Sequence, residues 1–445
     1  MDLQESVAAA LAGDRAVLIN LALRRLDWSR AEVALLGRGE ADAIARALEA
    51  ARKLVAPRRT APIEPVVIGQ HTPTTLAQLA RCLDHDDAVG GAICADGHLG
   101  YSQPVGGVVA YREHISVSGV GFDIACGNLA VRTDMPFAAV EGRVDAVLDE
   151  ICARISFGVG RVNDAPVEHA IFDDTDAWRA ADAIGLLSTA RKQLGTVGAG
   201  NHYVDLFHEV QPGVTPLASP VWIGIHFGSR GLGHKLATAY LKRGGGREGI
   251  DVPPTLLHQD SDLGRGYLAA MELAGRYAYA GRDWVAATVL DILGAHETDR
   301  VHNHHNFAWR EEVGGAPAWV VRKGCTPAFP GQRGFVGGSM GDDAVILEGV
   351  AGAEATALLS STVHGAGRIC GRKEAKRRFD RAEMDAWLSG RGVALRGGDL
   401  DESPMAYRRL PEVLAQHAGS IRILHTLRPF AVAMAGADVV DPFRD

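Results

Sequence analysis

Short apolar stretches rich in β-branched residues recur along the middle of the chain, separated by glycine-rich turns, and such stretches are typical of β-strands. The predicted strands are residues 105–110, 114–120, 129–132, 221–226, 319–322 and 345–347. Between them, apolar residues recur at helical spacing and predict helices at 139–155, 174–194, 262–294 and 405–417. Because strands and helices do not alternate regularly, we expect an α+β fold with a central, mostly antiparallel sheet rather than a doubly wound one.

The first sixty residues have a different pattern. In the alanine-rich stretch 41–55, apolar residues recur at nearly every third or fourth position, which predicts a helix. The sequence Arg-Arg-Thr-Ala-Pro at 58–62 ends this pattern, and a further proline follows closely as part of a linker. We expect an N-terminal helical segment at 1–60, one large domain at 61–436 and a tail at 437–445. The helical segment carries no recognisable chemistry, so we expect it to serve packing or an interface.

Composition and charge exclude several classes of protein. Of 445 residues, 47% are apolar and 22% charged, as is ordinary for a folded soluble protein. The net charge of −8 excludes a general basic coat, so contact with nucleic acid must depend on a local patch or on bound metal. The sequence shows neither a signal pattern nor an apolar run long enough to span a membrane. Six scattered cysteines form no CxxC pair, so we expect a reduced, cytoplasmic protein without membrane contact.

A histidine in a turn of small residues offers the first candidate chemistry. Residues 361–368 read Ser-Thr-Val-His-Gly-Ala-Gly-Arg, and the last five are His364, Gly365, Ala366, Gly367 and Arg368. Small neighbours let a phosphate-sized group approach the imidazole, and the arginine offers a charged fork for its oxygens. Because imidazole is a covalent nucleophile in some enzymes, one hypothesis is that His364 accepts a phosphoryl or nucleotidyl group. The alternative is a structural turn with an exposed histidine.

An aspartate and a cysteine three residues apart form a second candidate. Asp123 and Cys126 lie in the sequence Gly-Phe-Asp-Ile-Ala-Cys-Gly-Asn and are flanked by glycines, so both side chains can face one centre. A carboxylate together with a thiolate suits a divalent transition metal. The alternative is a buried cysteine beside an aspartate in a turn.

Histidines supply further candidate ligands. His202 follows a glycine loop, and His226 ends an apolar strand before a glycine-rich turn. His302, His304 and His305 stand close together. Along a strand the first two share one face and the third takes the other, so a single metal centre would not use all three. The alternatives are histidines satisfied in the core and a solvated, polar strand.

Three further segments could meet phosphate. Arg322 and Lys323 place two cations before a turn, and the glycine-rich loop 337–341 contains Ser339. Residues 368–381 carry seven arginines or lysines. On a helix these would spread over more than one face, as expected of a solvated helix or of a track for phosphates.

Together the candidates describe one centre. The ligands for two metal ions, with the thiolate able to bridge, are Asp123, Cys126, His202, His226 and His305. Such ligands favour Mn²⁺, Zn²⁺ or similar ions over Mg²⁺ or Ca²⁺. Two metals beside a nucleophilic histidine fit phosphoryl or nucleotidyl transfer.

With these segments in this order, the sequence resembles the RtcB family of RNA ligases. The shared segments, in the order of the family, are 96–100, 105–107, 123–127, 200–202, 226–233, 305–306, 322–328, 338–341 and 364–368. The resemblance implies an α+β catalytic domain built around a metal and nucleotide cleft. It implies a GTP- and Mn²⁺-dependent ligase that joins 2′,3′-cyclic-phosphate or 3′-phosphate RNA ends to 5′-hydroxyl ends. Its partners would be tRNA halves in splicing or broken RNA in repair, and Zn²⁺ or Co²⁺ are alternative metals.

The resemblance also assigns residues. It makes Asp123, Cys126, His202, His226 and His305 the metal ligands and His364 the guanylylated residue. The implied nucleotide contacts are Asn201, Asp205, Ser339, Gly365, Ala366, Gly367, Arg368 and Tyr407. Asp96 lies in a family motif near the catalytic centre, and Arg322 and Lys323 are further active-site candidates.

Several residues depart from the family pattern. Asp205 replaces a glutamate, Ala344 a serine and Ala435 a lysine at nucleotide-contacting positions, and Gly281 replaces an asparagine beside Arg282 in the long helix. The missing lysine motivates a second hypothesis, a metal-dependent enzyme that opens cyclic phosphates or nucleotidylates 3′-ends without sealing them. A third is a non-catalytic RNA-binding module, which the acidic charge and the intact ligand set oppose. The RNA substrate, the nucleotide, any accessory activator and the oligomeric state stay open, and a monomer is compatible with the sequence.

Overall fold

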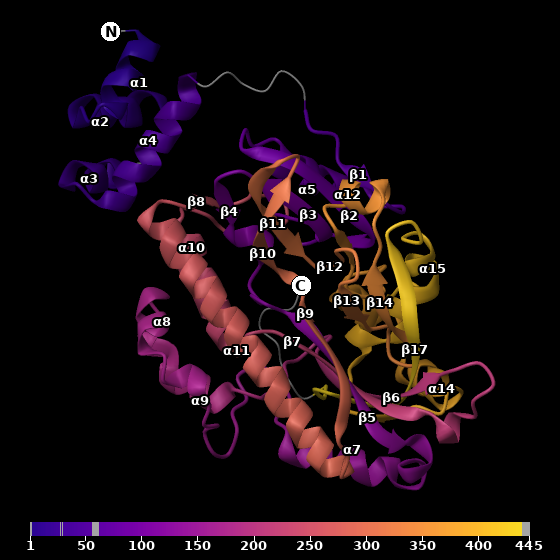
Figure 1. The fold of residues 1–445 in the computed structure, drawn as a ribbon. Coiled ribbons are helices and arrows are strands. Elements are labelled where there is room, and N and C mark those ends of the chain that lie inside the picture. The colour runs from indigo at the N-terminus through magenta and orange to yellow at the C-terminus, as the bar shows by residue number, and fades with distance from the viewer. Residues whose placement is uncertain (1, 27, 29, 56–61, 438–445) are drawn as a thin grey trace.

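The computed structural model describes residues 2–26, 28, 30–55 and 62–437. The predicted break at 58–62, up to residue 61, and the predicted tail from residue 438 onward lie outside the described residues. The described chain combines helices with two large, mostly antiparallel sheets, which confirms the predicted α+β class (Figure 1). Within the described ranges, no helix is both long enough and apolar enough to cross a membrane.

The larger sheet has eight strands. In sheet order its strands are β13 Arg333–Val336, β14 Ala344–Gly349, β17 Ile421–Met434, β6 Tyr203–Val210, β7 Pro220–Phe227, β5 Gly127–Pro136 and β9 Glu297–His304, with β16 Ala394–Arg396 pairing β17. All pairs are antiparallel except β16 with β17. The predicted strands 129–132, 221–226 and 345–347 lie within β5, β7 and β14 and are confirmed.

A second sheet has five strands, and two pairs of short strands flank it. In order the five are β1 Val66–Val67, β2 Ala88–His98, β3 Val105–Tyr111, β11 Ala316–Lys323 and β10 Asn306–Val313. The pairs are β12 Cys325–Pro327 with β15 Ser361–Val363, and β4 His114–Ser116 with β8 Leu256–His258. A single residue, His305, separates β9 of the larger sheet from β10, so the two sheets meet there.

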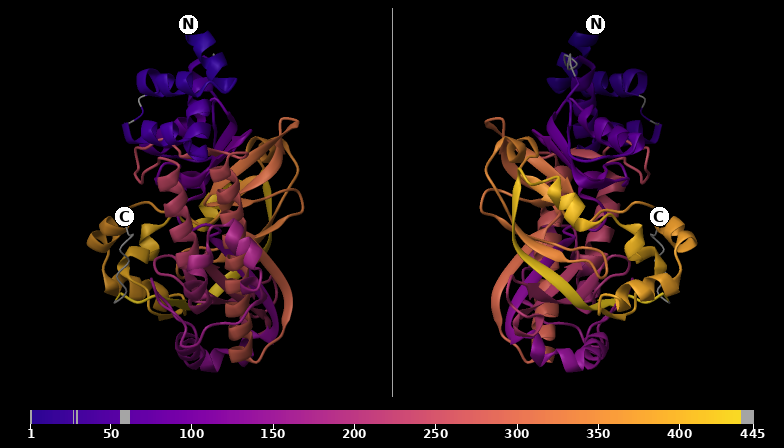
Figure 2. Two further views of the ribbon diagram at one scale, coloured as in Figure 1. Left: turned by 90° about the vertical axis from the view of Figure 1, so that its left-hand side faces the viewer. Right: turned by 90° about the vertical axis from the view of Figure 1, so that its right-hand side faces the viewer.

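The longest helix, α11 (Asp262–Leu293), packs across the larger sheet (Figures 1 and 2). The side chain of Ser261 accepts from the N–H of Gly264 at its start, and Gly294 ends it in the left-handed conformation with φ 69°. Val285 and Val289 of α11 join the apolar core under β5, β6 and β7. The other helices of this part are α5 Pro73–Leu83, α6 Val117–Val120, α7 Val144–Arg154, α8 Thr175–Ala180, α9 Leu187–Gln193, α10 Arg230–Arg243, α12 Ala353–Ala357, α13 Arg372–Arg378, α14 Arg381–Ser389 and α15 Leu410–Ala415.

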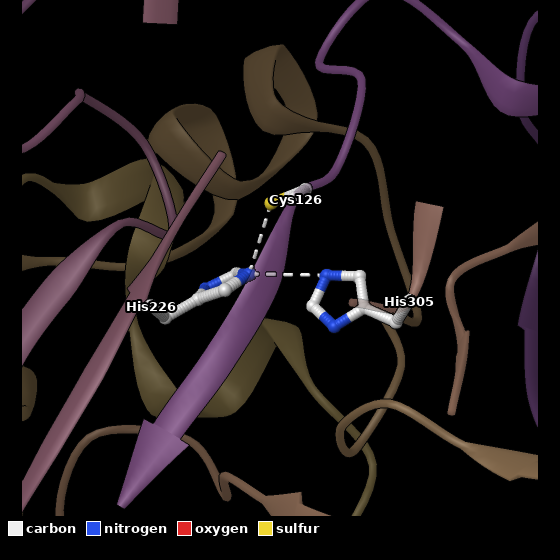
Figure 3. Close-up of side chains that lie close together, drawn as sticks. All are labelled: Cys126, His226 and His305. Atoms are coloured by element: carbon white, nitrogen blue, oxygen red, sulfur yellow. Dashed lines mark hydrogen bonds between the residues drawn. The ribbon is translucent and has the colours of Figure 1, made fainter. Parts of the chain in front are cut away.

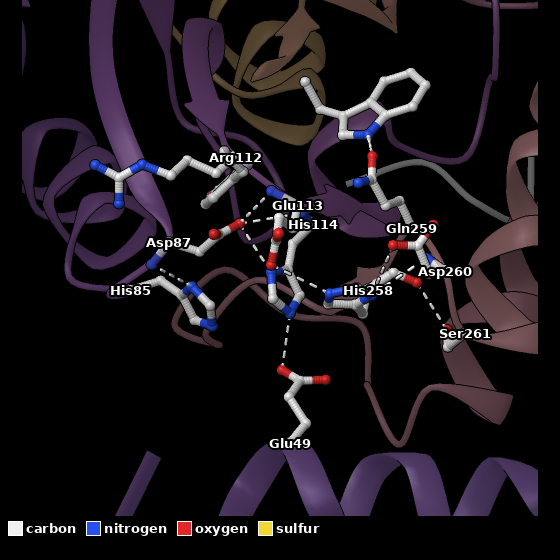
Figure 4. A network of polar contacts seen from close by, with 12 residues as sticks. Glu49, His85, Asp87, Arg112, Glu113, His114, His258, Gln259, Asp260 and Ser261 are labelled. Atoms are coloured by element: carbon white, nitrogen blue, oxygen red, sulfur yellow. Dashed lines mark hydrogen bonds and ion pairs between the residues drawn. The ribbon is translucent and has the colours of Figure 1, made fainter. Parts of the chain in front are cut away.

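Four N-terminal helices lie together at one end of the molecule (Figure 2). They are α1 Leu3–Leu11, α2 Arg15–Arg25, α3 Arg30–Arg38 and α4 Ala41–Val55, as the pattern of this segment predicts, and they enclose an apolar core of their own. A polar network centred on the buried ring of His114 attaches α4 to the rest of the chain (Figure 4). Glu49 of α4 pairs with Nε2 of His114 at 2.9 Å, and Asp87 pairs with Nδ1 of the same ring at 2.8 Å.

Several predicted elements are wrong in their extent. The predicted strand 114–120 ends at Ser116, because the hydroxyl of Ser116 accepts from the N–H of Gly119 and starts α6. The predicted helix 174–194 is interrupted between α8 and α9, where Asp182 has a positive φ of 55°. In place of helices spanning 139–155 and 405–417, α7 and α15 begin only after 3₁₀ turns.

The basic run 368–381 does not form one helix. Arg368 lies in a loop that bridges to Tyr407, α13 begins at Arg372, and Arg381 opens α14. Asp380 caps α14 by accepting from the N–H of Glu383, which fixes the break between the two helices. The basic side chains therefore divide between a cavity wall and the surface.

Candidate metal and nucleotide site

Four of the five predicted metal ligands gather at one edge of the larger sheet. Because β6, β7, β5 and β9 are antiparallel neighbours, the starts of β6 and β5 lie beside the ends of β7 and β9. His202 directly precedes β6 and Cys126 directly precedes β5, whereas His226 is the next-to-last residue of β7. His305 directly follows β9. Strand pairing thus brings together residues that lie far apart in the sequence.

Cys126 belongs to both groups of candidate ligands, and Figure 3 shows it beside His226, which in turn lies beside His305. Its Sγ is 3.2 Å from Nε2 of His226 and 3.5 Å from Nε2 of His202. Nε2 of His226 is 3.3 Å from Nε2 of His305, and Nε2 of His202 is 3.1 Å from Oδ2 of Asp123. Two triads therefore share the thiol, one with His226 and His305 and the other with Asp123 and His202.

Burial sets the protonation of these groups. Burial, aided by positive neighbours, lowers the pKa of His226 and of His305 well below the ordinary value, so both rings are neutral at pH 7. A neutral imidazole has a lone pair available for a metal. Burial also raises the pKa of the Cys126 thiol well above its ordinary value. A metal that binds here would displace the thiol proton, as metal–thiolate binding generally does.

The geometry of the ligand set fits transition-metal ions. Nδ1 of His226 bonds the main-chain oxygen of Asn201 at 2.7 Å, which turns Nε2 toward the other ligands. Oδ1 of Asp123 is buried without a hydrogen-bond partner among the described residues, and a bound cation would satisfy it. The sharing of Cys126 by both triads fits two ions with a bridging thiolate.

The three neighbouring histidines divide as strand alternation predicts. His302 and His304 both turn toward Arg282 of α11, whose guanidinium lies 2.7 Å from Nε2 of His302 and 3.0 Å from Nδ1 of His304. His305 faces the opposite side and joins the ligand set. The side chains thus alternate along this strand as predicted, and His305 is the one of the three that joins the candidate ligands.

His364 lies beside the ligands, in the turn after β15, with its ring centroid 5.0 Å from that of His305. Its Nδ1 is 2.7 Å from Oδ2 of Asp96, and the same oxygen accepts from its main-chain N–H at 3.1 Å. Burial would raise the pKa of Asp96, but the charge and the hydrogen bonds of His364 outweigh burial and lower it. Asp96 faces Nδ1, so Nε2 is the ring nitrogen that remains for another partner.

A cavity of about 770 Å³ joins His364 to the ligand set. Its walls include all five predicted ligands, Lys323 and every predicted nucleotide contact. Those contacts are Asn201, Asp205, Ser339, Gly365, Ala366, Gly367, Arg368 and Tyr407. A cavity of this size suits a small molecule such as a nucleotide. Lys323 is held by the main-chain oxygens of Tyr101 and Ser118, and burial lowers the pKa of its ammonium group to about 8.

Arg368 and Tyr407 form one wall of this cavity. The guanidinium of Arg368 lies 4.9 Å from the centroid of the Tyr407 ring, and its Nη1 donates to the phenol oxygen at 2.8 Å. Its Nη2 donates to the main-chain oxygen of Asp401 at 2.7 Å. The carboxylate of Glu402 accepts from Tyr407 and from Arg372. Because these bonds already hold Arg368 in place, the binding of a phosphate would cost little additional ordering.

Asp205 offers a different kind of contact. Burial raises the pKa of its carboxyl well above the ordinary value, which favours the protonated form. Its Oδ1 has no hydrogen-bond partner among the residues that the structure describes. A protonated carboxyl provides one donor and one acceptor, which suits the edge of a nucleobase.

Some candidates lie outside the cavity. Arg322 is wholly buried and pairs with Glu311 at 2.6 Å, because successive residues of β11 face opposite sides and only Lys323 faces the cavity. Of the two alanines that depart from the family pattern, Ala344 packs in an apolar core and Ala435 packs beside Ala199.

Residues that the sequence did not single out complete the site. Glu402 connects Arg368, Arg372 and Tyr407, and Nη1 of Arg230 lies 3.5 Å from Nδ1 of His202. Glu402 ends a 3₁₀ turn about thirty residues beyond its arginines, so spacing gave no signal. A clue to Arg230 was its glycine-rich turn, where it adopts a positive φ of 56°.

The fold and the site together define a class of protein. In this class, candidate metal ligands gather at the edge of a sheet, and a histidine paired with a carboxylate lies beside them in a cavity large enough for a nucleotide. The family model described as "tRNA-splicing ligase RtcB" matches residues 78–435. The chain therefore belongs to the RtcB family, which confirms the predicted resemblance. The four N-terminal helices precede the matched region.

Comparison with individual proteins gives the same family. The chain is 28% identical over 418 residues to the tRNA-splicing ligase RtcB of Thermococcus kodakarensis, covering 77% of this chain and 86% of that protein. It is 29% identical over 371 residues to the RNA-splicing ligase RtcB of Escherichia coli K12, covering 76% and 88%. Identity to the RNA-splicing ligase RtcB of Mycobacterium tuberculosis is 30% over 406 residues, covering 73% and 92%.

Proposed function

We propose that this chain is a cytoplasmic RNA ligase that joins 2′,3′-cyclic-phosphate or 3′-phosphate ends to 5′-hydroxyl ends, in tRNA splicing or RNA repair. The observation that supports the proposal is the position of His364, which pairs with Asp96 and lies beside the candidate metal ligands. Relatives of similar length are named RNA-splicing or tRNA-splicing ligases. The catalytic domain would span residues 61–436.

In the proposed reaction His364 is the nucleophile. With the proton on Nδ1 held toward Asp96, Nε2 attacks the α-phosphorus of GTP, an N–P bond forms and pyrophosphate leaves. The RNA 3′-phosphate then attacks the same phosphorus and releases His364. The 5′-hydroxyl attacks the activated 3′-phosphate, which forms the new phosphodiester and releases GMP. A cyclic end must first be opened to a 3′-phosphate by water.

The ligand set would hold two Mn²⁺ ions, with Zn²⁺ or Co²⁺ as alternatives. Bound metal would supply Lewis-acid stabilisation of phosphate charge. Arg368 would orient phosphate oxygens, while Tyr407 and Asp205 would contact the rest of the nucleotide. Asn201 and Ser339 lie on the same walls, and the turn of Gly365, Ala366 and Gly367 admits the phosphate to His364.

A second candidate function is end processing without sealing. It is favoured by Ala344 and Ala435, apolar residues packed against apolar neighbours where the family resemblance implies polar contacts to the nucleotide. Such an enzyme would open cyclic phosphates or nucleotidylate 3′-ends, with GTP replaced by another nucleotide.

Covalent labelling tests the proposal. The protein is incubated with Mn²⁺ and each α-³²P-labelled nucleoside triphosphate, and bound label is measured after denaturation. We expect an acid-labile, alkali-stable label that His364→Ala abolishes and that Asp96→Asn strongly reduces. Absence of label with all four nucleotides would refute the ligase proposal. RNA with cyclic-phosphate and 5′-hydroxyl ends then separates the two candidates, since processed ends without a joined product would favour the second.

A further inference from the structure

Arg282 lies directly behind the metal-ligand set, on α11, and its side chain is wholly buried. Its Nη1 donates to the main-chain oxygen of Phe227 at 2.6 Å and to that of Ala125 at 3.2 Å. Its other nitrogens lie against the rings of His302 and His304. One guanidinium therefore reaches the end of β7, the residue pair before β5 and the end of β9.

Each of these segments carries a metal ligand next to the residue that Arg282 contacts. Ala125 precedes Cys126, Phe227 follows His226, and His304 precedes His305. Because a peptide unit is rigid, fixing the Ala125 oxygen restricts the direction of the next residue's side chain. The Cys126, His226 and His305 segments are the ones that supply the first ligand triad.

The backbone around Arg282 shows that this arrangement is specific. Ala125 has a positive φ of 61°, a conformation that costs free energy for a residue with a side chain, and the bond to Arg282 helps to hold it. Gly281 lets α11 approach β7 closely, since a Cβ atom there would lie 3.2 Å from Cε2 of Phe227.

Arg282 forms hydrogen bonds to uncharged acceptors on several strands rather than a salt bridge to a carboxylate. The four acceptors are two main-chain oxygens and two imidazole nitrogens, all uncharged. Because a guanidinium can only donate, the ring nitrogens of His302 and His304 that face Arg282 act as acceptors. A planar group with five N–H donors can satisfy acceptors from several strands at once, which no other side chain can do.

We propose that Arg282 is a positioning residue that holds the Cys126, His226 and His305 segments in the geometry required for metal binding. This role rests on the metal site of the proposed function. It predicts that Arg282 controls the affinity and the coordination geometry of the metal although it touches neither metal nor substrate.

Titration with Co²⁺ tests the positioning role of Arg282 without an assay of RNA joining. Metal-free full-length protein is titrated with Co²⁺, and the thiolate charge-transfer and visible bands are recorded together with the thermal unfolding midpoint. We expect Arg282→Met to bind Co²⁺ about 10- to 100-fold more weakly than the wild type, with altered bands, as for other residues that support metal ligands. Arg282→Lys, which keeps the charge and some donors, should be intermediate and serves if the methionine variant does not fold.

The matched control is Val285→Ala, on the same helix. Val285 is wholly buried in apolar core, so its loss weakens the packing of α11 without removing a bond to a ligand segment. We expect a lower unfolding midpoint with unchanged Co²⁺ affinity and bands. Wild-type affinity and bands in both Arg282 variants would overturn the role, as would an equal loss of affinity in Val285→Ala. A wild-type chain that binds no Co²⁺ would overturn the proposed metal site itself, and this role with it.

Discussion

Two groups of buried histidines in this protein have opposite protonation. His226 and His305 at the ligand set are 5% and 2% exposed, and His114 below the N-terminal helices is 6% exposed. The pKa of each ligand-set ring lies well below the ordinary value, whereas that of His114 rises from 6.5 to about 9. Similar burial thus accompanies a neutral ring in one place and an imidazolium in the other.

The difference lies in the neighbours of each ring. Burial opposes the charge of His114 too, but Asp87 and Glu49 accept from its two nitrogens and more than offset that cost (Figure 4). At the ligand set, Nε2 of His226 faces Cys126 and His305. In one cluster the carboxylates already have a cation, the imidazolium of His114, while the other cluster presents lone pairs that an external cation can use.

The largest expected effect is on metal binding. His305→Ala removes a ligand of the first triad, so we expect Co²⁺ affinity to fall by more than about a hundredfold, beyond the loss typical of supporting residues. His114→Gln should leave the metal content unchanged, because His114 lies in the other cluster. Titration with Co²⁺ measures the affinity, and elemental analysis of dialysed protein measures the metal content of both variants. Equal metal loss in the two variants would show that the clusters are not independent.

The next effect is on stability against pH. The pKa of His114 is raised in the folded protein, so its contribution is fully present below about pH 6.5 and is lost as the pH rises through about 9. The shift corresponds to about 3 kcal/mol as an upper estimate. Denaturant unfolding of the wild type between pH 6 and 10 should show this loss, and His114→Gln should flatten it. An equally steep decline in the variant would assign it to other groups.

The chemistry of the ligand set could be predicted from sequence because residue types carry it. A cysteine, an aspartate and several histidines beside glycine-rich turns are typical of metal ligands, and strand alternation separated His305 from its neighbours. The network of His114 could not be predicted, since Glu49, Asp87 and His114 come from separate elements with no common motif. The same holds for Glu402 and for Arg282, whose roles depend on which strand ends meet.

The fold class could likewise be predicted from pattern, whereas element ends could not. Residues 114–120 are β-branched and apolar enough for a strand, yet one serine hydroxyl that caps a turn converts half of them to a helix. Arg322 and Lys323 look equivalent in sequence. Their side chains point to opposite faces of β11, and only the fold shows which face lines the cavity.

A smaller effect is expected from one carboxylate of the His114 network. Glu49→Gln keeps a hydrogen-bond acceptor for Nε2 but removes its charge, so the pKa of His114 should fall toward its ordinary value. We expect a loss of about 1 kcal/mol in the free energy of unfolding, because a hydrogen bond to a charged group contributes about 1.5–3 kcal/mol and a neutral one about 0.5–1.5 kcal/mol. NMR titration of the His114 ring measures the pKa. A ring that still titrates near 9 would show that Asp87 alone holds the proton.

The smallest effect concerns a solvent-exposed pair in the same network. Nε2 of His258 lies 3.3 Å from Oε2 of Glu113, and the glutamate side chain is 61% exposed. The ring of His258 lies 5.2 Å from that of His114, so the two histidines share a location and differ in their access to water. Because water screens an exposed pair, Glu113→Gln should change the free energy of unfolding by less than about 0.5 kcal/mol. Denaturant unfolding at pH 6 compares it with Glu49→Gln. Similar losses in both variants would mean that burial of the partner carboxylate does not set the strength of these ion pairs, and the contrast between the two histidine clusters would then need another cause.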